Sequence, residues 1–192
     1  MSTEHTAVDS LLARKASTGD KAAMKEIYAL HVRYLTAVCS RYVVNAEDVK
    51  DILQDTFVKI FSSIAAFTPS GDGSLRSWMT RITVNEALQF IRRKQRLLFT
   101  DLPDDDHSPA EPPPPDCDAI GADRIHEEIR KLPDGYRTIF NLFAIEGHSH
   151  KEIASMLGIT PSTSASQFHR AKTLLATRLS HITQSTPSKS PI

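Results

Sequence analysis

Residues 151–172 read KEIASMLGITPSTSASQFHRAK, and this stretch decides the fold. Ser149 is placed to cap a short helix, and Gly158 supplies the left-handed conformation that ends it. Thr160 followed by Pro161 then forms the cap and first turn of a second helix, because proline has a preset φ and its missing N–H is not needed there. The spacing therefore predicts a helix-turn-helix.

The second helix of this motif has one apolar and one polar side. The apolar stripe is expected to be buried and comprises Phe168, Ala171, Leu174, Leu175 and Leu179. The polar side chains are expected to lie toward solvent, where they could meet base edges and phosphates in a major groove. They are Ser162, Thr163, Ser166, Gln167, His169 and Arg170. The alternative is a helical hairpin whose polar side is merely solvated. This stretch alone leaves both DNA binding and a solvated hairpin open.

A proline-rich acidic segment precedes this part of the chain. Residues 111–115 read EPPPP, which the interior of a helix or strand does not accommodate. Residues 101–118 hold seven Asp or Glu and no Lys or Arg, so we interpret them as a disordered or extended linker. The 192 residues are then expected to form two small domains, 1–100 and 119–183, followed by a disordered tail at 184–192.

The formal net charge of zero hides an uneven distribution. Residues 1–100 carry 14 Lys and Arg against 10 Asp and Glu, and residues 119–192 carry 9 against 6. Both folded parts are therefore mildly basic, and the linker supplies the neutrality. The linker could fold back over the basic parts and compete with nucleic acid, or it could be a solubilising spacer.

Cysteine usage and the N-terminus bear on the compartment. Of the two cysteines, Cys39 falls on a predicted helix and is expected to be a small buried core residue, whereas Cys117 falls in the linker. The N-terminal MSTEHTAVDS lacks a signal pattern, and no apolar run approaches the roughly 20 residues that span a bilayer. A reduced, cytoplasmic protein is expected.

Apolar residues recur at helical spacing almost everywhere outside the linker. The predicted helices are a short one at Ser10–Ser17, three long ones capped by Asp20, Asn45 and Ser74, two in residues 120–132 and 136–146, and the two of the helix-turn-helix. The residues Pro133, Asp134 and Gly135 are expected to end the first of the later helices. The sequence thus predicts an all-α fold of two small domains, the second with four helices.

Basic residues gather on the third long helix. Between residues 75 and 99 only Glu86 opposes six cations, which are Arg76, Arg81, Arg92, Arg93, Lys94 and Arg96. Trp78, Asn85 and Gln89 are interleaved with them. Such a helix, beside a loop that starts at Phe67, could hold a phosphate backbone while unstacked bases occupy nearby pockets. Alternatively, Trp78 belongs to the core and the cations complement the helix dipole.

The helix capped by Asn45 has the opposite character. Glu47, Asp48, Asp51 and Asp55, with Gln54, lie beside a broad apolar stripe. This pattern suits docking on a basic or apolar helical partner, and a merely solvated face is the alternative.

Motifs of catalysis are missing from the sequence. It contains no Gly-rich phosphate loop, no GxSxG elbow and no HExxH. His148 and His150 have no companion ligands nearby, so no metal site is expected. We expect neither an enzyme nor a bound cofactor.

With these motifs in place, the chain resembles the extracytoplasmic-function group of bacterial RNA polymerase sigma factors over about residues 20–98 and 120–179. In the first part, DxxQ(D/E)xF is present at 51–57 and WxxRIxxN at 78–85, followed by IRRK. The second part carries LPxxYRxIF at 132–140, GxSxxEIAxxLGI at 147–159 and TxxSxFHRAK at 163–172. All of these motifs occur in the family's order.

The resemblance implies a role and a set of residues. The chain would bind core RNA polymerase, recognise the promoter −35 and −10 elements and promote melting, while the polymerase supplies the catalysis. The expected contacts with the polymerase are the clamp helices of the β′ subunit and the flap of the β subunit, and an inhibitory anti-sigma partner is a family expectation. The implied polymerase-binding residues are Asp48, Asp51, Gln54 and Asp55. The implied −10 residues are Phe67, Ser74, Arg76, Trp78, Arg81, Asn85, Gln89, Arg92 and Arg93. The implied −35 residues are Thr160, Ser162, Thr163, Ser166, Gln167, His169, Arg170 and Lys172.

The chain departs from the family pattern at three positions. Ala165 and Gln167 stand where many relatives have Lys and Arg, and Gln89 stands where Asp is common. The smaller number of cations on the second helix of the helix-turn-helix predicts that it binds DNA with lower affinity and with a smaller salt dependence. The main alternative function is a helix-turn-helix transcriptional regulator that acts without binding core polymerase, and a protein-binding adaptor is a further one.

Overall fold

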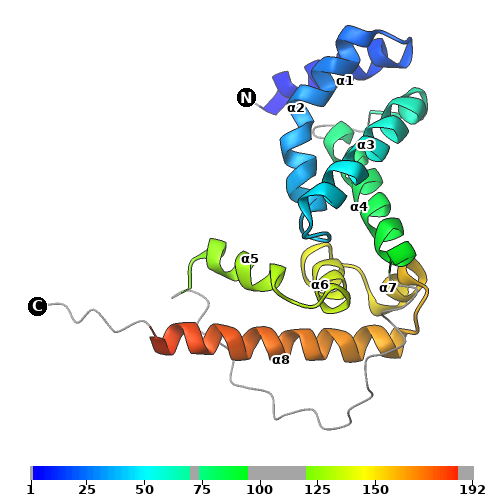
Figure 1. The fold of residues 1–192 in the computed structure, drawn as a ribbon. Helices are drawn as coiled ribbons and strands as arrows, with labels where there is room; N and C mark the ends of the chain where they lie inside the picture. Colours follow the sequence, from blue (N-terminus) through cyan, green and yellow to red (C-terminus); the bar gives the residue numbers. More distant parts are fainter. Residues whose placement is uncertain (1, 70–73, 95–119, 186–192) are drawn as a thin grey trace, which may run out of the picture. The chain divides into compact units, whose positions relative to one another are not determined.

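The computed structural model describes residues 2–69, 74–94 and 120–185, and the chain divides into two compact units, residues 1–94 and 95–192 (Figure 1). All regular elements in these described ranges are helical, so the predicted all-α class is confirmed. The predicted linker, Cys117 and most of the predicted tail lie outside the described residues.

The described residues of unit 1 form four α-helices and one 3-10 turn. They are α1 (Ser2–Ser17), α2 (Lys21–Cys39), α3 (Ala46–Ser63), η1 (Ile64–Ala66) and α4 (Ser74–Lys94). The predicted caps of α2 and α3 are confirmed. Asp20 Oδ1 accepts hydrogen bonds from the amides of Ala22 and Ala23, at 2.8 and 3.2 Å, and Asn45 caps α3 in the same way. The first helix is longer than the predicted Ser10–Ser17.

The core of unit 1 lies between α2, α3 and α4, with α1 packed on α2. Ile27, Leu35, Ile60 and Met79 are fully buried there. Cys39 is buried as predicted, and burial raises the pKa of its thiol to about 12. This thiol is therefore a core group and not a nucleophile.

Unit 2 contains α5 (Ala122–Arg130), α6 (Asp134–Phe140), the π-helical segment η3 (Asn141–Ile145), α7 (His150–Leu157) and α8 (Pro161–Ser185). The helices α5, α6 and α7 pack along α8 (Figure 1). Ile139, Leu142 and Ile153 are fully buried between them. Further along α8, Leu175 and Leu179 meet Ile129 of α5 in a second apolar cluster.

One predicted helix boundary is wrong. Asp134 and Gly135 do not lie between two helices but form the first turn of α6, directly after Pro133. The buried side chain of Arg137 explains the difference, because it pairs with Asp134 Oδ1 at 2.6 Å and so fixes the carboxylate inside the first turn. Helix α6 therefore begins at Asp134, directly after the turn that ends α5.

Candidate nucleic-acid interface and docking face

The acidic residues of α3 share its solvent side. Asp51, Gln54 and Asp55 are exposed, Asp48 is half-buried, and the opposite side of the helix buries Leu53. The spacing of three and four residues produces this division. The predicted docking residues thus lie together on one face, which we call the acidic face (Asp48, Asp51, Gln54 and Asp55).

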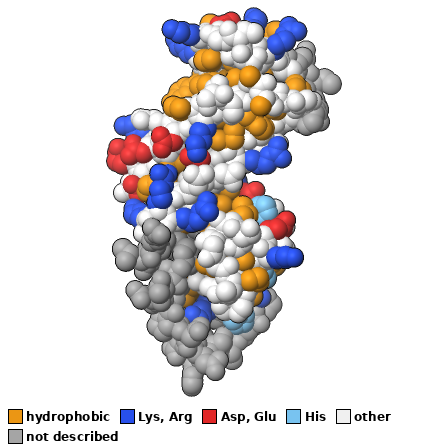
Figure 2. All heavy atoms as spheres, turned by 90° about the vertical axis from the view of Figure 1, so that its right-hand side faces the viewer, with side chains coloured by type: hydrophobic (Ala, Val, Ile, Leu, Met, Phe, Trp, Pro, Cys, Tyr) orange, Lys and Arg blue, Asp and Glu red, His pale blue; other side chains and the backbone are white. Residues whose placement is uncertain are grey.

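A hollow of about 470 Å³ adjoins the acidic face. It is lined on one side by Asp48, Asp51, Ile52 and Asp55 of α3 and on the other by Glu86, Phe90, Arg93 and Lys94 of α4. Figure 2 shows acidic side chains gathered in one place on the surface, with Lys and Arg close by. The surface therefore combines carboxylates, an aromatic ring and a cationic rim.

Two ion pairs connect α3 and α4 beside this hollow. Lys94 Nζ lies 2.8 Å from Asp48 Oδ2, and Lys59 pairs with Glu86, whose side chain is only 6% exposed. Sequence reasoning did not identify Glu86 or Lys94 as part of this surface. The sequence did contain a signal for both residues, because residues 86, 90, 93 and 94 recur at helical spacing and so share one face of α4.

A second face of α4 carries most of the predicted −10 residues. Trp78, Arg81, Asn85, Gln89 and Arg92 follow one another at three or four residues and so form one stripe along the helix. Arg81, Asn85 and Arg92 are exposed, whereas Trp78 and Gln89 are half-buried. We call this stripe the basic stripe.

Three other predicted −10 residues lie off this stripe. Arg76 places its guanidinium 3.7 Å from the centroid of the Tyr34 ring, a cation–π contact that holds it against α2. Arg93 lines the hollow beside the acidic face, and Ser74 begins α4. The nine residues predicted to bind the −10 element therefore lie on more than one surface of unit 1.

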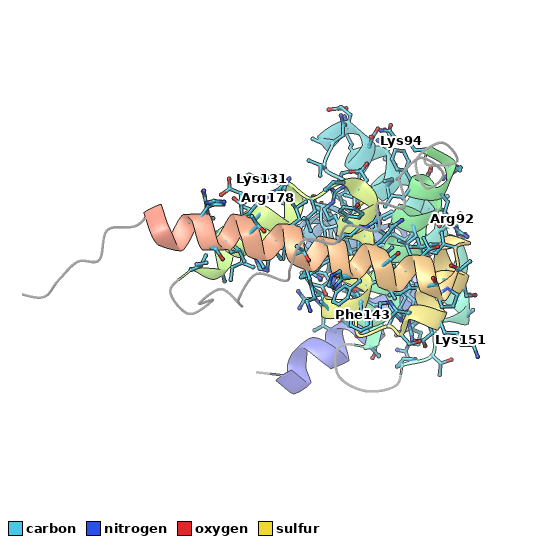
Figure 3. All side chains as sticks on the ribbon, turned by 90° about the horizontal axis from the view of Figure 1, so that it is seen from below. Arg92, Lys94, Lys131, Phe143, Lys151 and Arg178 are labelled. Atoms are coloured by element: carbon cyan, nitrogen blue, oxygen red, sulfur yellow. The ribbon has the colours of Figure 1, made fainter. Side chains whose placement is uncertain are left out.

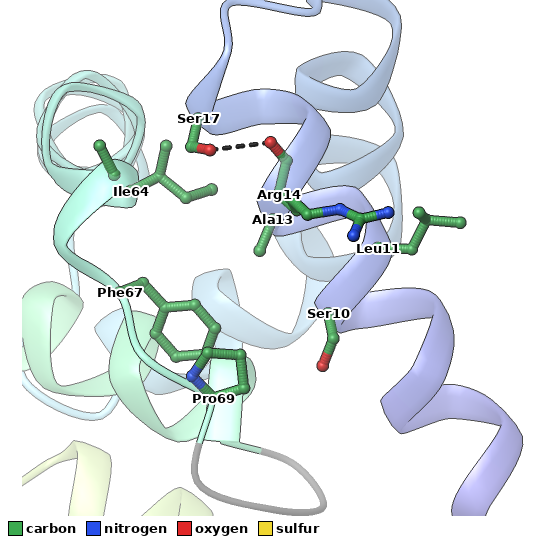
Figure 4. A pocket seen from close by; sticks show the side chains of 9 residues that line it. Ser10, Leu11, Ala13, Arg14, Ser17, Ile64, Phe67 and Pro69 are labelled. Carbon is green, nitrogen blue, oxygen red and sulfur yellow. Dashed lines mark hydrogen bonds between the residues drawn. The ribbon is translucent and has the colours of Figure 1, made fainter.

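Trp78 packs against Phe67, with ring centroids 5.3 Å apart. Phe67 in turn borders a hollow of about 480 Å³ between α1 and the segment after α3 (Figure 4). Its lining residues are Ser10, Leu11, Ala13, Arg14 and Ser17 of α1, with Ile64, Ala65, Phe67 and Pro69. The contribution of α1 was not predicted, since only tertiary packing brings that helix to Phe67.

The helix-turn-helix is formed by the local contacts that the sequence predicts. Ser149 and Glu152 form a capping box, in which Glu152 accepts from the Ser149 amide at 2.8 Å and its own amide donates to Ser149 Oγ at 3.3 Å. Ser149 Oγ also donates to Glu152 Oε2 at 2.7 Å, and this bond, together with the one from the Ser149 amide, lowers the pKa of Glu152. Gly158 ends α7 with φ +71°, and Thr160 Oγ1 caps α8 through the Thr163 amide at 3.0 Å. Both predicted helix starts are confirmed.

The residues predicted to read the −35 element differ in how exposed they are. Ser162, Ser166 and Lys172 are exposed, with Thr160 just before the helix. Thr163, His169 and Arg170 are half-buried.

Gln167 is buried, with 3% exposure, so its predicted position toward solvent is wrong. The buried stripe begins with Ser164 and Gln167 and continues through Ala171, whereas Phe168, predicted to start it, is only half-buried. Among the described residues, Gln167 Oε1 has no hydrogen-bond partner. This placement removes Gln167 from the candidate base-reading residues.

His150 belongs to the packing of this unit. Its Nδ1 lies 3.0 Å from Ser164 Oγ, and its ring stacks on Phe143 with centroids 4.3 Å apart. Phe143 lies beside α8, where its ring centroid is 4.4 Å from that of Phe168 (Figure 3). Within the described ranges, His, Cys, Asp and Glu form no group of three that could hold a metal ion.

These surfaces define the class of the molecule. A unit with an acidic face and a basic stripe precedes a unit that presents a helix-turn-helix, which is the arrangement of a helical, DNA-binding transcription factor. In the ranges that the structure covers, no helix combines the length and apolarity needed to cross a membrane.

Comparisons with known proteins identify the family. The family model for Sigma-70 region 2 matches residues 27–97, and that for Sigma-70 region 4 matches residues 122–175. RNA polymerase sigma factor NccH of Alcaligenes xylosoxydans xylosoxydans is 30% identical over 179 residues, which cover 90% of this chain and 95% of NccH. The chain belongs to the extracytoplasmic-function group of RNA polymerase sigma factors, as the sequence motifs indicated.

Other relatives are similar to different extents. ECF RNA polymerase sigma factor SigE of Mycolicibacterium smegmatis is 34% identical over 164 residues, which cover 81% of this chain but only 62% of SigE. The solved structure of CnrH in complex with the cytosolic domain of CnrY matches with a TM-score of 0.46 and 24% identity, covering 93% of this chain and 99% of the other.

Proposed function

We propose that this sigma factor binds core RNA polymerase through the acidic face of α3, recognises the −10 element through α4 and the −35 element through α8, and promotes melting of promoter DNA. The observation that carries the proposal is the presence, in unit 1, of the acidic face on α3 and the basic stripe on α4. One surface has the charge to attract a cationic protein and the other has the charge to attract DNA.

The basic stripe has the chemistry to bind a single strand. Arg81 and Arg92 are exposed cations for phosphates, and Asn85 carries an amide for base edges. Aromatic rings stack with any unpaired base. The hollow of about 480 Å³ is large enough for an unstacked base and is lined by Phe67, whose ring packs against that of Trp78. These features support capture of the melted −10 strand.

The exposed polar side chains of α8 support duplex recognition. Ser162 and Ser166 can donate to or accept from base edges, and Lys172 can contact a phosphate. The small number of cations predicts modest affinity for duplex DNA alone. Binding of the −35 element would therefore depend on simultaneous contact of unit 1 with polymerase and DNA.

Run-off transcription with core RNA polymerase and a promoter library tests the proposal. The full chain should direct a defined start on some templates, and core enzyme without the chain should not. If no template gives a defined start, while the chain still binds upstream duplex DNA without core enzyme, the alternative of a polymerase-independent regulator would replace it.

An inhibitory anti-sigma partner stays a prediction for this chain. A partner that covers the acidic face would exclude polymerase from the same carboxylates. Competition between such a partner and core enzyme for the full chain tests this point, and simultaneous binding of both would contradict a shared face.

A further inference from the structure

Arg93 lies on a different side of α4 from its neighbour Arg92. Consecutive residues of an α-helix point about 100° apart, so Arg92 falls on the basic stripe whereas Arg93 lines the hollow of about 470 Å³ between α3 and α4. Both side chains are exposed. The sequence patterns assign both arginines to the −10 element, but only Arg92 shares a face of the helix with Asn85 and the other residues of the stripe.

Two cations beside this hollow are already paired. The ammonium of Lys94 lies 2.8 Å from Asp48 Oδ2, and Lys59 pairs with Glu86. Both pairs join α3 to α4, so they use charges of the hollow to hold the two helices together. A partner would have to break these pairs to use them.

Three charged groups that line the hollow lack such pairs. Among the residues that the structure describes, Asp51, Asp55 and Arg93 make no ion pair, and all three are exposed. The two carboxylates lie on the α3 side and the guanidinium lies on the α4 side. The hollow therefore offers a partner two negative charges on one wall and one positive charge on the other.

A surface that covers the hollow has to match both signs. A partner that carried only Lys and Arg would pair with Asp51 and Asp55, but it would also set a like charge against Arg93. Removing the guanidinium from water without a counter-charge is unfavourable. A partner with cations opposite α3 and a carboxylate opposite α4 satisfies every charge that is free to pair, and a carboxylate accepts two parallel hydrogen bonds from a guanidinium.

We propose that Arg93 binds polymerase and not DNA, through a carboxylate on the surface that docks on the acidic face. The inference rests on the proposed function, which assigns polymerase to that face. The docked surface then carries Lys or Arg for the α3 wall and an Asp or Glu for Arg93. The two signs also fix the direction of docking, because a partner turned around would bring like charges together on both walls.

The affinity of the full chain for core RNA polymerase tests this role. The readout is fluorescence anisotropy of the chain labelled with fluorescein at its N-terminus. Arg93→Ala should weaken binding about two- to fivefold, the range that an exposed ion pair can supply, and Arg93→Lys should restore most of the loss. Arg33→Ala is the control for loss of a cation, because Arg33 is exposed on α2 and lines neither the hollow nor the stripe.

The sign of the change decides between the two kinds of partner. If the docked surface carries cations alone, Arg93 repels it, and Arg93→Ala should strengthen binding of core enzyme. A stronger complex would therefore overturn the inference. An affinity that equals that of Arg33→Ala would overturn it as well, since Arg93 would then make no contact with polymerase.

Binding of a short, fluorescein-labelled single-stranded oligodeoxynucleotide tests the other half of the inference. Arg92→Ala should lower the affinity, and the slope of log affinity against log salt should become shallower by about 0.7, as for one lost phosphate contact. Arg93→Ala should match the control Arg33→Ala in both respects. If Arg93→Ala changed the slope as much as Arg92→Ala does, Arg93 would bind DNA and the inference would fail.

Run-off transcription by the wild type separates this inference from the proposed function. A defined start by the wild type, with Arg93→Ala binding core enzyme as tightly as the wild type, would overturn the role of Arg93 alone. Failure of the wild type to bind core enzyme and to direct a defined start would overturn the proposed function, and the inference with it.

Discussion

Arg137 Nη1 donates a hydrogen bond to the carbonyl oxygen of Leu132, at 2.8 Å, and so ties the first turn of α6 to the end of α5. The same side chain also donates to the carbonyl of Arg130 at 3.3 Å, and it pairs with Asp134. The residue is 2% exposed. A single buried guanidinium therefore satisfies carbonyls that the end of α5 leaves without intrahelical partners.

Replacement of Arg137 by Met should destabilise the protein. The variant keeps an unbranched side chain but leaves the Leu132 carbonyl without this donor, so the free energy of unfolding should fall by about 2 kcal/mol. Arg130→Met is the matched control, because Arg130 is exposed and its loss should change stability by less than about 0.5 kcal/mol. Denaturant unfolding followed by circular dichroism measures both, and equal effects would contradict this role of Arg137.

Replacement of Gln167 by Met should have the opposite effect. A buried amide oxygen without a partner among the described residues destabilises the fold, so an apolar side chain of similar length should raise the free energy of unfolding by about 0.5–1 kcal/mol. Binding of a −35 duplex should stay unchanged, whereas Arg170→Ala should weaken it. A Gln167→Met variant that folds and loses duplex binding would restore Gln167 as a reading residue.

Local contacts explain why much of the fold was predictable. The caps at Asp20, Asn45 and Ser149 join residues two or three positions apart, so the sequence contains both partners. Gly158 is similar, because the left-handed conformation is its own property. Cys39 was correctly predicted to be buried, because a single cysteine on a helix usually behaves as a small apolar residue.

Tertiary contacts explain what the sequence did not reveal. Gln167 is buried because α8 turns that side toward the unit's core, and its polar character concealed this position. The start of α6 depends on a buried Arg137, which sequence patterns place on the surface by default. The pairing of Lys94 with Asp48 joins residues 46 positions apart. Such contacts follow from how helices pack and not from local spacing.

Acid should destabilise unit 1 through His31. This residue is buried on α2 with Nε2 3.5 Å from Asp9 of α1, and Arg76 lies nearby. Burial lowers the pKa of His31 below its ordinary value of 6.5, against the opposing effect of Asp9. The unfolded chain therefore binds this proton more readily, and stability should fall as the pH drops below about 6.5.

Comparison of the wild type with His31→Gln isolates this contribution. The difference in unfolding free energy between pH 7.5 and pH 5.5 should be smaller in the variant, because glutamine does not titrate. His126→Gln is the matched control for the loss of a histidine, since His126 is exposed on α5. Denaturant titrations at the two pH values provide the measurement, and identical pH dependence in wild type and His31→Gln would contradict the assignment.

Charge reversal on the acidic face should abolish association with polymerase. Asp51 and Asp55 are both exposed and one turn apart, so replacing both by Arg turns a surface that attracts cations into one that repels them. The fold should be retained, because neither side chain belongs to the core of unit 1. Glu26→Arg, at an exposed position of α2, is the control for charge reversal away from the face.

Size-exclusion chromatography with core RNA polymerase measures the outcome. The wild type and Glu26→Arg should co-elute with the enzyme, and the double variant should elute alone with an unchanged circular dichroism spectrum. An unchanged spectrum matters because it separates loss of a docking face from loss of structure. Co-elution of the folded double variant would mean that the carboxylates of α3 are merely solvated, since a cationic partner could not tolerate two arginines in their place.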